Sequence, residues 1–548
     1  MNKKLEEFTK EELLAYVRQL QKDTKFGLVW NPKEEQVAID CESKVPVLQE
    51  VTEKIINKSD DKEPTHLLIE GDNYHSLSVL NYTHRAKVDV IYIDPPYNTG
   101  NKDFTYNDHY VDKEDPYKHS KWLSFMDNRL RLAKDLLTDS GVIFISIDDN
   151  EQAHLKLLSD EIFGEENFVA TIIWQKKFSR SNDATYFSTM HDYVLCYAKN
   201  HILNNQKGFR LKLLSRANEI PKGYSNPDND PRGVWASVIL SAKSGSEKLV
   251  YEIESPSGKK HLPPDGRYWS VNKDKLEELI KEKRIWFGKN GNGTPRLKTF
   301  LSEVQQGLTP NTIWFHEEVG HNQEARQELK KIFDGQGSFD NPKPLKLIDR
   351  ILRLTTSPEE PSVVLDFFAG SGTTGHAVLK LNAQDGGKRQ FILCTNNENG
   401  IAENITYERI NKAINGYSSV DGIPAKLRYY KTDFVVTSGL NKITDKDKLE
   451  ITREMGSMIA LRENTFEQIE QTDHWQLYES ASQITAIYYR EDKTKIVDLL
   501  AKLNTQAKPV KLYVFGWGKN AGIEYVSNKI SVEDIPEPLI EVYKEIAR

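Results

Sequence analysis

A buried strand that ends at two prolines places the strongest constraint on how this chain folds. Residues 88–93 read Val-Asp-Val-Ile-Tyr-Ile, a largely apolar, β-branched run of the kind found in buried parallel strands. Pro95 and Pro96 cannot continue a ladder of hydrogen bonds, so the strand stops there. Asp94 and Tyr97 therefore lie at its carboxyl end. In open α/β sheets that edge is where ligands bind.

The groups at this strand end suit an exocyclic amino group. The Asp94 carboxylate and the Pro95 carbonyl are two acceptors side by side, and an exocyclic amino group has two N–H donors. The ring of Tyr97 offers a flat face on which a base taken out of its stack can lie. A plain turn is the alternative interpretation, because Asp-Pro pairs initiate turns.

A second buried strand, at residues 363–366, ends in Asp366 and enters a glycine-rich turn that is followed by a helix. Glycines let the backbone approach a ligand closely, and a helix amino terminus offers unpaired N–H groups. The glycine spacing differs from the dinucleotide fingerprint, and no Gly-Lys pair in the chain is followed by Ser or Thr, as a phosphate-binding loop requires. The turn therefore favours a small zwitterion over a pyrophosphate, with a plain tight turn as the alternative.

Together the two motifs resemble those of amino-methyltransferases that use S-adenosylmethionine and modify the exocyclic nitrogen of adenine in DNA. In that family Asp-Pro-Pro-Tyr is the catalytic motif and Phe-x-Gly-x-Gly the cofactor motif, matched here by residues 94–97 and 368–372. This order of motifs resembles the permuted β class. Four stretches are similar to the modification subunit of type III restriction-modification systems: residues 68–73, 94–100, 191–199 and 343–348.

The resemblance implies a Rossmann-like methyltransferase sheet, S-adenosylmethionine as cofactor and no metal in the reaction. The catalytic residues that it implies are Asp94, Pro95, Pro96 and Tyr97. The cofactor-binding residues that it implies are Asp72, Asp94, Lys343, Pro344, Asp366, Phe368, Ala369, Gly370, Ser371, Gly372, Thr373 and Glu398. Glu398 follows a predicted strand, where an acid can accept both ribose hydroxyls. For Asp72, capping of the following helix is an equally physical interpretation.

Strands and helices alternate along the core, which predicts an α/β, doubly wound sheet. An insert is expected because 366 − 94 = 272 residues separate the two acids, far more than one crossover needs. The expected parts are an N-terminal helical and irregular extension (1–64), the catalytic half of the core (65–199), a target-recognition insert (200–335), the cofactor half (336–438) and a small C-terminal α/β interaction domain (439–548).

Two smaller expectations concern the extension and the insert. An apolar stripe predicts a helix over residues 5–22. Arginines in and near the insert are candidates to read guanine edges or to grip phosphates. They are Arg180, Arg210, Arg216, Arg232 and Arg296.

Composition agrees with a soluble, cytoplasmic protein. No apolar run is long enough to span a bilayer, and the three scattered cysteines form neither a disulfide framework nor a metal cluster. A net charge of −7 does not exclude DNA binding, because affinity depends on a local basic face.

The function that these features indicate is site-specific methyl transfer to the N6 of a flipped-out adenine in double-stranded DNA. The alternatives are an N4-cytosine or RNA amino-methyltransferase and a catalytically inert DNA-binding specificity subunit. The resemblance also implies a homodimer and a separate restriction subunit with helicase and nuclease activity.

Overall fold

The computed structural model describes residues 9, 30, 32–59, 63–101, 103–182, 184–201, 208–215, 220–304, 307–335, 339, 341–489, 493–515 and 528–546. The helix predicted for residues 5–22 lies outside this part of the chain. The chain forms two compact units, one of residues 1–211 with 311–548 and the other of residues 212–310.

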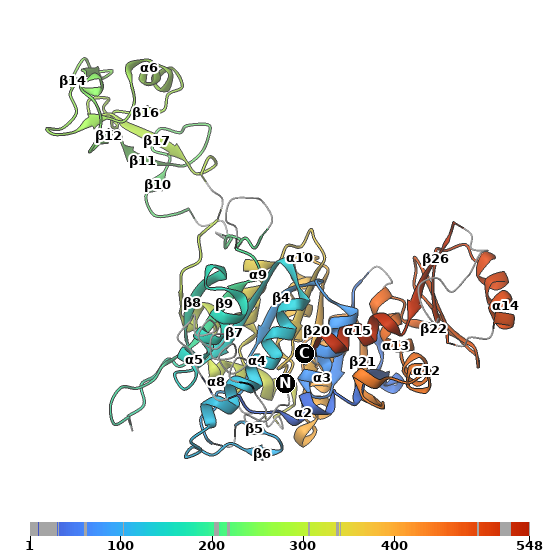
Figure 1. Ribbon diagram of the computed structural model, residues 1–548. Helices are drawn as coiled ribbons and strands as arrows, with labels where there is room; N and C mark the ends of the chain where they lie inside the picture. Colours follow the sequence, from blue (N-terminus) through green and yellow to red (C-terminus); the bar gives the residue numbers. More distant parts are fainter. Residues whose placement is uncertain are drawn as a thin grey trace. The chain divides into compact units, whose positions relative to one another are not determined.

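An eleven-stranded sheet runs through the larger unit (Figure 1), and it confirms the predicted α/β class. The strands from β21 to β7 in the spatial order are parallel, as in a doubly wound fold. In spatial order they are β1 (Lys44–Glu50), β21 (Lys426–Val436), β3 (Thr65–Glu70), β20 (Arg389–Thr395), β19 (Ser362–Asp366), β4 (Val88–Ile93), β7 (Leu137–Ile147), β9 (His191–Ala198), β8 (Phe168–Gln175) and β18 (Ile313–Trp314), with β2 (Ile56–Asn57) paired to β21.

Six helices of the larger unit form two packed groups. In the first group α4 packs against both α3 and α5, and in the second α10 packs against both α9 and α11. The first group is α3 (Asn73–Thr83), α4 (Lys118–Leu136) and α5 (Gln152–Phe163), and the second is α9 (Leu345–Thr355), α10 (Thr373–Asp385) and α11 (Glu408–Asn415).

The two motif-bearing strands are neighbours. β4 and β19 run parallel, with Val90 paired to Val364 and Ile91 to Leu365. Both strands therefore end at the same edge of the sheet, although 272 residues separate Asp94 from Asp366 in the sequence.

The segment before β3 is more regular than the sequence predicts. Residues 44–50 form β1, which pairs antiparallel with β21 where irregular chain is expected. Its apolar side chains are buried, and the carbonyl of Pro46 accepts a hydrogen bond from the Tyr543 hydroxyl at 2.7 Å. Pro46 interrupts the alternation that would signal a strand, but an edge strand tolerates proline.

The polar stretch 100–116 contains a short hairpin of β5 (Thr105–Tyr106) and β6 (His109–Tyr110).

The smaller unit is built on a four-stranded antiparallel sheet. Its strands, in spatial order, are β10 (Tyr224–Ser225), β11 (Trp235–Ile239), β17 (Arg296–Phe300) and β16 (Ile285–Trp286), and α6 (Lys273–Lys281) lies in the same unit. The entering and leaving segments are joined by paired backbone hydrogen bonds of 2.8 and 2.9 Å between Leu214 and Leu308. This unit is narrower than the 200–335 insert that the sequence predicts, because β18 pairs with β8 and belongs to the large sheet.

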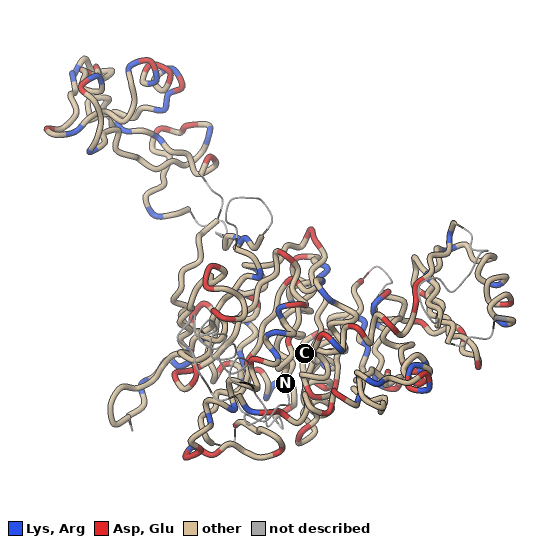
Figure 2. Tube along the Cα trace, viewed as in Figure 1, with Lys and Arg blue, Asp and Glu red and all other residues tan. Residues whose placement is uncertain are grey.

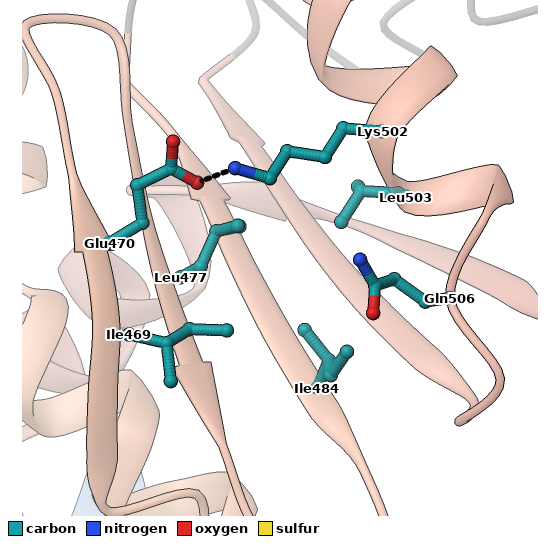
Figure 3. A pocket seen from close by; sticks show the side chains of 7 residues that line it. All are labelled: Ile469, Glu470, Leu477, Ile484, Lys502, Leu503 and Gln506. Carbon is teal, nitrogen blue, oxygen red and sulfur yellow. Dashed lines mark hydrogen bonds and ion pairs between the residues drawn. The ribbon is translucent and has the colours of Figure 1, made fainter.

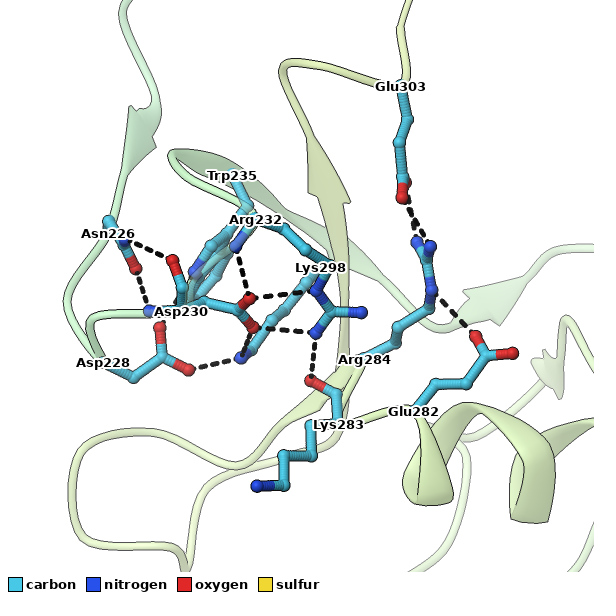
Figure 4. Close-up of polar contacts among 10 residues, drawn as sticks. All are labelled: Asn226, Asp228, Asp230, Arg232, Trp235, Glu282, Lys283, Arg284, Lys298 and Glu303. Atoms are coloured by element: carbon cyan, nitrogen blue, oxygen red, sulfur yellow. Dashed lines mark hydrogen bonds and ion pairs between the residues drawn. The ribbon is translucent and has the colours of Figure 1, made fainter.

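A buried ion cluster supports the sheet of the smaller unit (Figure 4). The Lys298 ammonium contacts Asp228 and Asp230, and the Arg232 guanidinium donates to both carboxylate oxygens of Asp230 at 2.9 and 2.8 Å. These partners hold the pKa of Asp230 well below its usual range, with the hydrogen bond from Arg232 as the largest cause. Arg232 is thus engaged within the unit, and Arg296 likewise donates to Ser237.

The C-terminal part carries a second sheet of five strands. They are β22 (Glu467–Gln471), β23 (Trp475–Glu479), β24 (Ile484–Tyr488), β25 (Val510–Phe515) and β26 (Ile530–Ile535), with helices α12 (Asp445–Glu454), α13 (Gly456–Glu463), α14 (Lys493–Asn504) and α15 (Glu537–Ile546). A cavity of about 270 Å³ lies beside α14, where Glu470 and Lys502 form an ion pair (Figure 3).

Charged residues of both signs are interspersed along both units (Figure 2). Among the described residues, no helix is at once long enough and apolar enough to cross a bilayer.

Candidate active site

The end of β4 holds an acid and an aromatic ring in direct contact. The Tyr97 hydroxyl donates to one carboxylate oxygen of Asp94 at 3.0 Å. Burial raises the pKa of Tyr97 well above its usual range, so its phenol stays protonated and remains a donor. The Asp94 side chain is 26% exposed, which leaves the carboxylate accessible beside the ring.

Lys343 comes from the segment that precedes α9 and reaches the same carboxylate. Its ammonium donates to the second oxygen of Asp94 and lies 5.2 Å from the centroid of the Tyr97 ring. The Lys343 side chain is only 9% exposed. The sequence motif at 343–348 and the catalytic motif are thus joined by a largely buried ion pair.

The proline pair is fixed from outside the strand. The indole N–H of Trp122, on α4, donates to the Pro96 carbonyl at 2.7 Å. The Pro95 carbonyl accepts no hydrogen bond within the described part of the chain. One carbonyl is therefore anchored, and the neighbouring carbonyl stays available as an acceptor.

The glycine-rich turn after β19 is shaped by Asp366. One of its oxygens accepts from the Phe368 backbone N–H at 3.0 Å, and the other accepts from the Thr374 hydroxyl at 2.5 Å. Burial raises the pKa of Asp366 to about 7, and the nearby charge of Asp94 adds to this rise.

Two glycines in this turn have left-handed backbones, with φ of +49° at Gly370 and +74° at Gly372. A Cβ at Gly370 would lie 3.2 Å from Cζ of Phe339. The turn thus needs glycine for its conformation and for its close packing.

Comparison with known proteins identifies the family. A family model described as DNA methylase, covering N6 and N4 methylases, matches residues 88–409. The chain belongs to the DNA methylase family.

Three relatives are modification subunits of type III restriction-modification enzymes. The StyLTI Mod subunit of Salmonella typhimurium LT2 is 39% identical over 389 residues, which are 67% of this chain and 56% of that protein. The EcoP15I Mod subunit of Escherichia coli is 30% identical, covering 70% of this chain and 67% of the relative. The EcoPI Mod subunit of Escherichia phage P1 is 31% identical, and the match covers 75% of this chain and 68% of the relative.

The chain therefore spans between about half and two thirds of the length of these relatives. Among solved structures, a putative DNA modification methylase from Thermus thermophilus, complexed with S-adenosyl-L-methionine, covers 66% of this chain and 99% of its own chain, at 16% identity and a TM-score of 0.30.

In this DNA methylase, Asp72 has a structural role in addition to the role in cofactor binding that the sequence predicts. It caps α3 by accepting from the Tyr74 backbone N–H at 2.7 Å, and it contacts the guanidinium of Arg129 at 3.3 Å. The adjacent Asn73 donates to the Phe367 carbonyl at 3.2 Å. Asp72 therefore lies at the same sheet edge as the glycine turn.

Glu398 lies three residues beyond β20, which is the strand between β3 and β19. Its side chain is exposed at this same edge. The methylase thus brings four acids, Asp72, Asp94, Asp366 and Glu398, to the ends of four adjacent strands.

Two residues that the sequence did not single out support the glycine turn of the methylase. The buried guanidinium of Arg409 donates to the hydroxyls of Ser371 at 3.1 Å and Thr373 at 2.7 Å. The Thr406 hydroxyl donates to the Gly370 carbonyl at 2.6 Å. Burial lowers the pKa of Arg409 to about 10, which still leaves it charged at neutral pH. The sequence signal that could have identified Arg409 was a charged residue next to the apolar Ile410 on α11.

Asp192, on β9, is a further buried acid near this edge. It forms an ion pair with Lys176, yet burial raises its pKa to about 6. The charges of Lys343 and Asp94 also act on it, which places Asp192 close to the catalytic strand end. Asp192 could have been identified from the sequence as the one acid in the otherwise apolar run 192–198.

Proposed function

We propose that this chain is a site-specific DNA methyltransferase that transfers a methyl group from S-adenosylmethionine to the N6 of a flipped-out adenine. The observation that supports the proposal most directly is the pairing of β4 with β19. This pairing sets an acid, two prolines and a tyrosine beside a glycine-rich turn, so that a base and a methyl donor can bind next to each other.

The residues at the edge fit S-adenosylmethionine. Close backbone approach at the turn 368–373 suits the amino-acid part, and Glu398 is placed to accept ribose hydroxyls. Lys343 and Pro344 border this region, and Asp366 holds the turn in shape. When bound, the cofactor supplies an electrophilic methyl group on its sulfonium.

Asp94 and the Pro95 carbonyl would accept the two N–H groups of the adenine amine. A carboxylate has about four lone-pair sites, so Asp94 can accept the amine while it keeps the donors from Tyr97 and Lys343. These bonds would orient the nitrogen lone pair toward the methyl group. Asp94 is also placed to take up the proton that the nitrogen loses on methylation.

Positioning supplies most of the rate enhancement in this scheme. Pro96 is anchored by Trp122 and fixes the path of the chain between the acid and the ring. The ring of Tyr97 would stack on the flipped-out base.

The same proposal includes the role of the protein in a cell. The chain would be the modification subunit of a type III restriction-modification system, acting on double-stranded DNA in the cytoplasm. It would form a homodimer and assemble with a restriction subunit that carries helicase and nuclease activity. The names of three relatives support this assignment. Residues 212–310, which fold as a unit of their own, are the proposed target-recognition insert.

Labelled methyl transfer tests the proposal. Full-length protein is incubated with labelled S-adenosylmethionine and unmethylated genomic DNA, and the DNA is then digested to nucleosides and separated. N6-methyl-2′-deoxyadenosine is expected from the wild type and from the control Asp139→Ala, an exposed acid away from the edge. Asp94→Ala is expected to lose transfer while still binding the cofactor. N4-methyl-2′-deoxycytidine in place of that product, or full activity of Asp94→Ala, would each contradict the assignment.

A further inference from the structure

Three metal-ligating side chains meet on the helices next to the catalytic motif. His119 lies in the first turn of α4, while Glu151 directly precedes α5 and His154 lies in its first turn. One ligand atom from each of the three residues lies within 4.8 Å of the others. The two imidazole rings have centroids 4.6 Å apart.

The carboxylate of Glu151 lies between the two histidines. Its Oε1 is 2.6 Å from Nδ1 of His119, and its Oε2 is 2.9 Å from Nδ1 of His154. Each carboxylate oxygen therefore faces one imidazole nitrogen. This is how a bidentate carboxylate and two imidazoles would share a single cation.

Unsatisfied atoms at the same place point independently to a ligand. Glu151 is 0% exposed, and its Oε2 makes no hydrogen bond within the described residues. The Nδ1 of His154 is also buried without a hydrogen bond there, although it lies 2.9 Å from that oxygen. Buried polar atoms are nearly always satisfied, so such a pair calls for a bound ion or water.

We propose that His119, Glu151 and His154 bind one zinc ion. Two imidazoles and a carboxylate are a ligand set that zinc takes, with water in the remaining position. Both histidines are partly exposed, which gives the ion and its water a path to the site.

Asn98 forms the outer shell of this site. Its amide donates to Oε1 of Glu151 at 2.5 Å, and its backbone directly follows Tyr97. Outer-shell hydrogen bonds orient metal ligands. The zinc ion would therefore tie the amino termini of α4 and α5 to the chain that leaves the catalytic motif. This assignment does not depend on the proposed methyl transfer.

Zinc binding to the untagged, full-length chain is the test. The protein is stripped with a chelator and dialysed, and zinc is then added while binding and Tm are measured. We expect one zinc ion per chain and a rise in Tm on saturation. Cobalt bound in its place should give visible absorption bands.

Two single-residue variants test whether the zinc ion binds at this site or at another histidine pair. His154→Ala is expected to weaken zinc binding beyond the roughly 10- to 100-fold typical for loss of an outer-shell partner, and to remove the rise in Tm. His154 is partly exposed, so the variant should fold, which circular dichroism checks. The control His316→Ala alters a second histidine pair, with His321 at 5.7 Å between centroids, and should bind zinc as the wild type does.

Absence of zinc binding would overturn the proposal. So would zinc binding that survives His154→Ala, because the metal would then be held elsewhere and Glu151 would simply pair with its histidines. Loss of binding in His316→Ala but not in His154→Ala would assign the zinc to the control pair.

Discussion

Lys343 and Asp94 form an ion pair although 249 residues separate them in the sequence. The lysine comes from the segment that precedes α9, and the aspartate follows the end of β4. The pair therefore joins two distant parts of the chain at the point where the base and the methyl donor are proposed to meet. Lys343 also lies over the Tyr97 ring, so one ammonium contacts both side chains of the catalytic motif.

Lys343→Met should weaken both the fold and the reaction. A largely buried hydrogen bond between charged groups contributes about 1.5–3 kcal/mol, and its loss leaves Asp94 less well oriented. We expect the free energy of unfolding in urea to fall by about this amount. Methyl transfer should fall more than cofactor binding. Lys346→Met is the matched control, because Lys346 is exposed and, among the residues that the structure describes, forms its ion pair with Glu324. Equal effects of the two variants would contradict the role of the pair.

Gly370→Ala should impair cofactor binding beyond its effect on stability. Its left-handed backbone costs a non-glycine residue about 1–2 kcal/mol, and the new Cβ would press on Phe339. Gly386→Ala is a close control, since Gly386 has a φ of +71° with open space around it at the end of α10. Calorimetry with S-adenosylmethionine should show weaker binding only for Gly370→Ala. Unchanged affinity would remove the turn from the cofactor site.

The hydroxyl and the ring of Tyr97 should have separable roles. Tyr97→Phe keeps the stacking face and loses only the hydrogen bond to Asp94. Tyr97→Ala loses the ring, and stacking of a base on an aromatic ring contributes roughly 1–3 kcal/mol. We expect kcat/KM to fall about 10- to 100-fold further in Tyr97→Ala than in Tyr97→Phe, because about 1.4 kcal/mol is tenfold. Base flipping, followed by 2-aminopurine fluorescence, should weaken in the same order.

Asp366 should make stability depend on pH. Its folded pKa is about 7, against an ordinary value of 3.8, so the folded state retains a proton that the unfolded state loses. Its contribution to stability is therefore fully present below pH 4 and is lost as the pH rises to about 7. Urea unfolding at several pH values should show this fall in the wild type.

Asp366→Asn should lose the part of this slope between pH 6 and 7. Below pH 6 a shallower slope should persist, because Asp192 has a folded pKa of about 6 and acts in the same direction, while the contribution of Asp366 to that range is gone. An unchanged slope above pH 6 would show that Asp366 is ionised in the folded protein. Asp139→Asn, at an exposed site, controls for the loss of one carboxyl group.

The core of the fold could be predicted because its signals are local. An apolar run that stops at Pro95 or at a glycine turn marks a strand and its carboxyl end, and parallel strands put such ends at one edge. In α4, Leu123, Met126, Leu130 and Ala133 recur at helical spacing, so this helix can also be recognised from the sequence.

The supporting contacts could not be predicted because their partners are distant in the sequence. Nothing near Arg409 indicates that it holds Ser371, and β1 is recognisable only through its pairing with β21. The boundaries of the smaller unit could not be predicted from the sequence either. β18 has only two residues, which are too few to show a periodic pattern. It pairs with β8, and residues 311–335 belong to the larger unit.

The hydrogen-bonded junction between Leu214 and Leu308 gives the smaller unit ends that lie together. A segment that starts and finishes at one point can be exchanged for another of different length without stretching the chain on either side. Because the smaller unit is the proposed target-recognition insert, grafting the corresponding stretch of a related enzyme between residues 212 and 310 should alter sequence specificity while methyl transfer is retained.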